Sequence, residues 1–268
     1  MVIARCHRAA EMGVQIQMVV AQAKEMVRSA NGRVEEHQPL ADLEALKQLA
    51  NQVSRQISPM MGLETLDRHR WTGQVIHQPD GLWVDVAGAS HLFGDETGMM
   101  LTTHRLLRQN GYAAKMAIAD TLGAAWAVTH QPDASPLRTS PAIPVPLPGN
   151  HLPDGWIVPR GETETILRPL NVQGLRISND TAGTLARLGV QTIEQLMQLP
   201  RGGLATRLGN SLVQRLDQAL GQRDETFQVH SLPAEDHVQL EMEYPTDDRL
   251  ILCDRMKKLA DQIRAGLA

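Results

Sequence analysis

Proline is concentrated in one part of this chain, and that concentration restricts the fold more than any other feature. Eight of the fifteen prolines lie between Pro132 and Pro159. Proline lacks a backbone N–H and clashes with the preceding helical turn, so this stretch cannot form a long helix. We interpret it as a linker or an extended crossing that separates a mixed region from a helical region.

The composition is that of a globular protein, with 268 residues, 42% apolar and 21% charged. The net charge of −4 provides no global positive field, so DNA binding would depend on local basic patches. Cys6 and Cys253 lie far apart and have no metal-ligand spacing, which argues against a disulfide framework or a zinc site. No apolar stretch is long enough to span a membrane, so we expect a cytoplasmic protein with no membrane partner.

Before the proline-rich stretch, helical and extended patterns alternate. The predicted helices are 5–12, 18–27, 41–57, 95–109 and 122–130, and the predicted extended runs are 72–77, 82–87 and 113–119. Pro79, Asp80 and Gly81 have turn chemistry between the first two extended runs. The order helix, strand, strand, helix, strand is most of a ferredoxin-like βαββαβ layer without its first strand, so we predict an α+β fold.

After the proline-rich stretch, the sequence predicts short helices joined by glycine turns. Ser178 is a candidate helix cap, Thr192 and Gln195 form a capping box, and Gly209 and Gly221 end further helices. Turns of this kind can direct backbone N–H groups at a DNA phosphate, as in helix-hairpin-helix modules. Ordinary helix packing explains the same pattern, so both interpretations stay open.

Five stretches form a set that spans nearly the whole chain: VIARCHRAAEMGVQIQM, PDGLWVDVAGASHLFGDE, AIADTLGAAWAVTH, IVPRGETETILRPLNV and LARLGVQTIEQLMQLPRGGLATRLGNSLVQRLDQALG. In this order they resemble the Y-family of translesion DNA polymerases, and within it the non-catalytic ImuB-like proteins. The resemblance implies an incomplete polymerase fold, in which a helix-hairpin-helix-type thumb follows a ferredoxin-like palm without its first strand.

The implied domains are partial fingers at 1–40, the palm at 41–160 with a Pro-rich insertion at about 131–155, the thumb at 161–230 and the beginning of a little finger at 231–268. Strands left without partners are templates for aggregation. We therefore expect the chain alone to be marginally stable and poorly soluble.

The resemblance also allows the polymerase centre to be compared position by position. Active members hold two metal ions with an Asp of the first palm strand and an adjacent Asp-Glu pair. The pair corresponds to Asp80 and Gly81, and glycine has no side chain to bind a metal. Asp80 is thus a vestigial candidate for which we favour the role of a tight-turn residue over that of a metal ligand, and we assign Asp85 a structural hydrogen bond. We predict no metal and no cofactor, with Mg²⁺ relevant only if the chain is an active polymerase.

The triphosphate contacts of active members are replaced as well. Their fingers Tyr and Arg and their palm Lys correspond to His7, Ala10 and Leu122. Without these groups little offsets the triphosphate charge. We therefore interpret the chain as a degenerate DNA nucleotidyltransferase that is not an enzyme.

The candidate DNA-binding residues lie in the implied thumb and are Arg201, Gly202, Gly203 and Arg207. Acidic neighbours weaken the same assignment for Arg215 and Arg223. The segment GLRIS stands where active members usually have a Gly-x-Gly turn, which removes half of the expected grip on DNA.

Our main hypothesis is a non-catalytic adaptor in DNA damage tolerance, translesion synthesis and SOS mutagenesis. The resemblance implies as partners DNA, a sliding clamp, a recombinase-like accessory protein and an error-prone replicative-type polymerase. One alternative is an active translesion polymerase whose first strand lies upstream of a misassigned Met1. Another is a helix-hairpin-helix DNA-binding module without polymerase ancestry.

Overall fold

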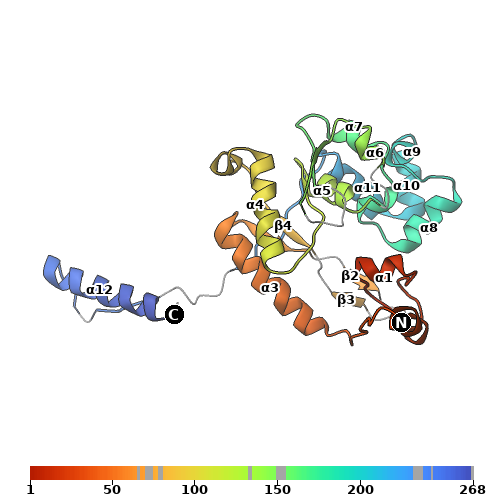
Figure 1. Ribbon diagram of the computed structural model, residues 1–268. Helices are drawn as coiled ribbons and strands as arrows, with labels where there is room; N and C mark the ends of the chain where they lie inside the picture. Colours follow the sequence, from red (N-terminus) through yellow and green to blue (C-terminus); the bar gives the residue numbers. More distant parts are fainter. Residues whose placement is uncertain are drawn as a thin grey trace. The chain divides into compact units, whose positions relative to one another are not determined.

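The computed structural model describes residues 1–64, 67–69, 75–77, 81–131, 135–148, 155–231, 238–242 and 244–266 (Figure 1). The chain divides into two compact units, Met1–Val229 and His230–Ala268. The first unit contains every described strand and all the described helices except the last.

The chain begins with two short helices, α1 (His7–Glu11) and α2 (Val20–Arg28). They correspond to the helices predicted at 5–12 and 18–27, with shifts of one or two residues at the boundaries. Val14, Ala23 and Val27 form their small core. This part of the chain therefore has an apolar centre of its own.

The next part is a two-stranded sheet covered by two long helices. These elements are α3 (Pro39–Gln56), β1 (Met61–Leu63), β4 (Leu82–Val84) and α4 (Glu96–Gln109), with a 3₁₀ turn, η1 (Ser90–Phe93), before α4. β1 and β4 pair antiparallel, with Met61 opposite Val84 and Leu63 opposite Leu82. These four side chains belong to the apolar cluster that α3 and α4 complete.

The two extended runs predicted around the Pro-Asp-Gly turn contain strands, but the strands do not pair with each other. β2 (Asp67–His69) pairs with β3 (Val75–His77), whereas β4 pairs with β1. Alternating side chains predict an extended backbone and leave the partner strand open. Pro79 and Asp80 of the predicted turn lie outside the described residues.

A second sheet has the order β5-β7-β6, from β5 (Ala117–Ile118), β7 (Gly155–Ile157) and β6 (Ile143–Val145). β7 runs parallel to β5 and antiparallel to β6. The described strands thus fall into three separate sheets instead of one βαββαβ layer. The α+β class of the fold is nevertheless as predicted.

The proline-rich stretch is more than the linker that the sequence predicts. It contains α6 (Ser135–Arg138) and β6, and it buries Leu137, Val145 and Leu147. Pro144 is compatible with a strand here because β6 lies at the edge of its sheet, where one side of the backbone needs no partner.

The remaining helices of the first unit share its largest core. They are α5 (Leu122–Thr129), α7 (Thr163–Leu167), η2 (Val172–Leu175), α8 (Asn179–Arg187), α9 (Ile193–Met197), α10 (Arg201–Leu208) and α11 (Asn210–Ala219). The predicted capping box is present, since Thr192 caps α9 and the Gln195 side chain accepts from the Thr192 N–H. Ala127 of α5 and Leu212 of α11 belong to one cluster, so the helices on both sides of the proline-rich stretch pack together.

The second unit contains one long helix, α12 (Arg249–Gly266). Leu250 and Met256 on this helix are exposed, at 81% and 68%. Among the described residues, no helix is both long and apolar enough to cross a membrane.

Candidate polymerase centre and nucleic-acid interface

Gly81, which the resemblance aligns with a metal-binding carboxylate, lies beside the buried Glu64. The β1–β4 ladder continues past the strand ends, because the Glu64 N–H donates to the Gly81 carbonyl at 2.9 Å. A Cβ placed on Gly81 would lie 3.6 Å from the Glu64 Cβ. Glu64 is 1% exposed. Glu64 was not predicted as a neighbour of Gly81, since this proximity depends on the strand register.

No group of three or more metal-ligating side chains occurs in the described part of the chain, and Asp80 lies outside it. Asp85 has the structural hydrogen bond that we predicted, since its carboxylate accepts from the Ala87 N–H at 2.9 Å.

The start of α5, which the resemblance aligns with the Lys of active members, is packed against α11. Thr121 caps α5 by accepting from the Ala124 N–H at 3.0 Å, and its hydroxyl donates to the Ala219 carbonyl at 2.9 Å. A Cβ on Gly123 would lie 2.6 Å from the Ala219 Cα. Leu122 is half-buried. This helix start therefore presents an apolar side chain and a helix contact where a triphosphate needs cations.

The other two positions of the triphosphate site lie on α1. Ala10 is half-buried in the last turn of that helix, and the side chain of His7 lies outside the described set. Ala10 cannot replace an arginine, because it has neither charge nor hydrogen-bonding atoms.

The structure separates the predicted DNA-binding arginines into two kinds. Arg201 forms an ion pair with Asp217 and donates to the Gln222 side chain at 3.0 Å. Arg215 forms an ion pair with Glu225 at 2.7 Å. Arg207 and Arg223 are both exposed and make no ion pair with a described residue, so both are available to a phosphate.

The N-termini of α10 and α11 are exposed to solvent. A Cβ on Gly202 or Gly203 would have no described atom within 4 Å. Within the described chain, neither α10 nor α11 has a side-chain cap at its N-terminus. Free N–H groups at a helix start attract anions. Arg207, Gly209 and the start of α11 thus form a surface that suits a phosphate.

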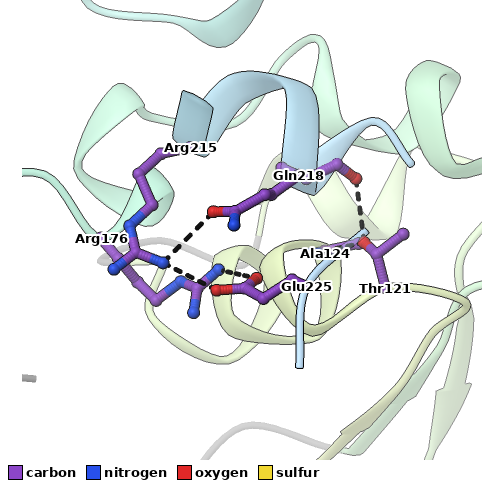
Figure 2. A network of polar contacts seen from close by, with 7 residues as sticks. Thr121, Ala124, Arg176, Arg215, Gln218 and Glu225 are labelled. Carbon is purple, nitrogen blue, oxygen red and sulfur yellow. Dashed lines mark hydrogen bonds and ion pairs between the residues drawn. The ribbon is translucent and has the colours of Figure 1, made fainter. Parts of the chain in front are cut away.

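Arg176, which belongs to the segment GLRIS, points toward Glu225 (Figure 2). Arg176 has a left-handed backbone, with φ of 57°, and its side chain is 6% exposed. It forms an ion pair with Glu225, which also accepts from Arg215, and its guanidinium lies 5.6 Å from the Trp83 ring centroid. Burial lowers the pKa of Arg215 below its usual value, and the positive charge of Arg176 lowers it further. This cluster was not predicted, because Arg176 and Glu225 are far apart in sequence.

The chain was compared with known proteins. No model of a protein family matches it. It is 33% identical over 192 residues to the protein ImuB of two Caulobacter vibrioides strains, which covers 72% of this chain and 34% of ImuB. The chain thus spans about a third of the length of these relatives.

Two solved structures share the fold of this chain. A DinB family error-prone DNA polymerase from Sulfolobus solfataricus matches 98% of this chain and 71% of its own, with a TM-score of 0.57 and 13% identity. A Dbh ternary complex matches 98% of this chain and 69% of its own, with a TM-score of 0.57 and 14% identity. At these identities the likeness concerns the fold alone.

Proposed function

The chain is an ImuB-like protein with the fold of the Y-family DNA polymerases, and we propose that it associates with DNA in translesion synthesis without incorporating nucleotides. The observation that supports this most is Gly81, which stands in the place of a metal-binding carboxylate. Two-metal nucleotidyl transfer depends on carboxylates that hold both ions at the attacking and leaving oxygens.

The absence of catalysis has a second, independent support. The start of α5 is packed against α11 and begins with Leu122 instead of a cation. Adding one carboxylate would therefore leave the triphosphate charge without its counter-ions. We infer that several parts of the centre have been lost together.

DNA association is supported by the thumb surface. Arg207 and the uncapped start of α11 provide a positive charge and N–H donors to a phosphate. Contacts of this kind hold the backbone and do not select sequence. The likeness to DinB over 98% of the chain argues against an unrelated helix-hairpin-helix module.

From the similarity to ImuB, we propose that the DNA-bound protein is an adaptor in damage tolerance and SOS mutagenesis in the cytoplasm. Its proposed partners are a sliding clamp, a recombinase-like accessory protein and an error-prone replicative-type polymerase. The match covers only 34% of ImuB. These partners are therefore proposed for a whole protein of that length and not for this chain by itself.

DNA binding can be tested by fluorescence anisotropy with a labelled primer-template at several salt concentrations. We expect weak, sequence-insensitive binding, and we expect Arg207→Ala to reduce the salt slope by about 1. Arg201→Ala should have a smaller effect, because Arg201 is paired with Asp217. Arg105→Ala on the palm helix α4 is the control for an exposed arginine outside the thumb. An unchanged affinity and salt slope in Arg207→Ala would contradict the proposed interface.

A further inference from the structure

The chain leaves the thumb through residues Glu225–Gln228 and passes directly over β1. Gly62, in the middle of that strand, is buried. A Cβ on Gly62 would lie 2.3 Å from the Gln228 carbonyl oxygen and 2.6 Å from Cδ2 of Phe227. The first of these atoms is backbone and cannot turn aside, so this close crossing requires a glycine at position 62.

The crossing lies on a defined face of the β1–β4 sheet. Side chains alternate along a strand, and directly opposed residues share a face. Gly62 is opposite Trp83, and Glu64 adjoins Gly81, so these four positions lie on one face. The opposite face packs on α3 and α4. The segment Glu225–Gln228 therefore covers the first of these faces at Gly62, whereas a Cβ on the half-exposed Gly81 would have, among the described atoms, only the Glu64 Cβ within 4 Å on the same face.

The beginning of this segment is held by charge. Glu225 is 11% exposed and binds both Arg176 and Arg215 (Figure 2). Arg176 in turn lies over Trp83, the residue opposite Gly62. One end of the segment is thus fixed beside Trp83, and the other end rests on Gly62.

We propose that Glu225–Gln228 form a strap that closes the Gly62–Trp83 part of this sheet face, and that this part of the face opens to a ligand only when the strap is released. The strap is held at one end by the ion pairs of Glu225 and at the other by the close crossing over Gly62. The proposal goes beyond the proposed function and does not depend on the role of Gly81.

The two phenylalanines of the chain, Phe93 and Phe227, make a direct test possible. Hydroxyl-radical footprinting with mass spectrometry reports the solvent access of each ring in one sample. Phe227 is a half-buried residue of the strap whose ring lies over Gly62, whereas Phe93 packs on the α3–α4 core. We expect Gly62→Ala to raise oxidation of Phe227 by about threefold relative to Phe93, through local opening of the strap.

Two further variants make the test specific. Glu225→Gln keeps the shape of the side chain and removes the charge that anchors the strap, so it should also raise Phe227 oxidation. Gly183→Ala is the matched control, because a Cβ there would lie 3.8 Å from the Arg187 side chain, an ordinary contact distance. If Gly62→Ala unfolds the chain, Phe93 oxidation rises as well. The Phe227 oxidation of Glu225→Gln is then the measurement that tests the strap.

A Phe227 ring that is as reactive in the native protein as in urea would overturn the strap, as would unchanged Phe227 oxidation in both folded variants. The footprint uses neither DNA nor nucleotide. If Phe227 oxidation contradicts the strap and primer extension is absent, the proposed function stands. Primer extension by a protein with a protected Phe227 would contradict the proposed function and leave the strap intact.

Discussion

Removal of the Glu225 carboxylate should strongly destabilise the first unit, although Glu225 lies in a non-helical segment after α11. Glu225 is the counter-ion of two arginines, and the Arg176 side chain is only 6% exposed. In Glu225→Ala the Arg176 charge stays buried without its partner. The Nε atom of Arg176 already lacks a hydrogen-bond partner among the described residues, so this side chain has little to replace the loss.

The expected cost follows from these exposures. Breaking a buried pair by removing one partner costs about 3–5 kcal/mol. Arg215 is 30% exposed and can turn toward water. We therefore expect a loss of unfolding free energy near the lower end of this range. A loss of about 3 kcal/mol corresponds to a fall in Tm of roughly 6–12 °C for a unit of this size.

Thermal denaturation followed by circular dichroism measures this loss. The matched control is Glu194→Ala, which also breaks an ion pair with an arginine, Arg168, but between side chains 49% and 43% exposed. Exposed pairs contribute at most about 1 kcal/mol, so this variant should melt within a few degrees of the wild type. Equal small changes in both variants would refute the argument that burial makes the Glu225 pairs strong.

Two other substitutions test local packing. Gly123→Ala should cost about 1–3 kcal/mol in thermal denaturation, because its Cβ would overlap the Ala219 backbone, whereas Gly183→Ala, with room for a Cβ, should be neutral or stabilise by up to about 1 kcal/mol. Thr192→Ala should lower stability in urea by about 1 kcal/mol, because it removes the side-chain cap of α9, and no change would show that the capping box contributes little.

Local signals in the sequence predicted the helical part well. Ser178 and Thr192 cap the helices that they were expected to cap, and Gly209 and Gly221 have the positive φ that a turn after a helix favours. These features depend on neighbours three or four residues away. For that reason a single sequence is enough to find them.

Features that depend on distant partners were missed or wrong. The strands around the Pro-Asp-Gly turn pair with β1 and β2 instead of with each other. The proline-rich stretch provides an edge strand, which its composition alone could not distinguish from a linker. The Arg176–Glu225 pair joins residues 49 positions apart, so no local pattern reveals it. Glu64 became relevant only when the register placed it beside Gly81.

The central claim is that this polymerase fold does not incorporate nucleotides, and a primer-extension assay tests it most directly. The chain is incubated with a primer-template and all four dNTPs, with Mg²⁺ and separately with Mn²⁺, and the products are resolved at single-nucleotide resolution. We predict no extended primer with either metal, because Gly81 and Leu122 provide neither a metal ligand nor a cation. Template-directed extension by the wild-type chain that disappears in Asp80→Ala would contradict the account.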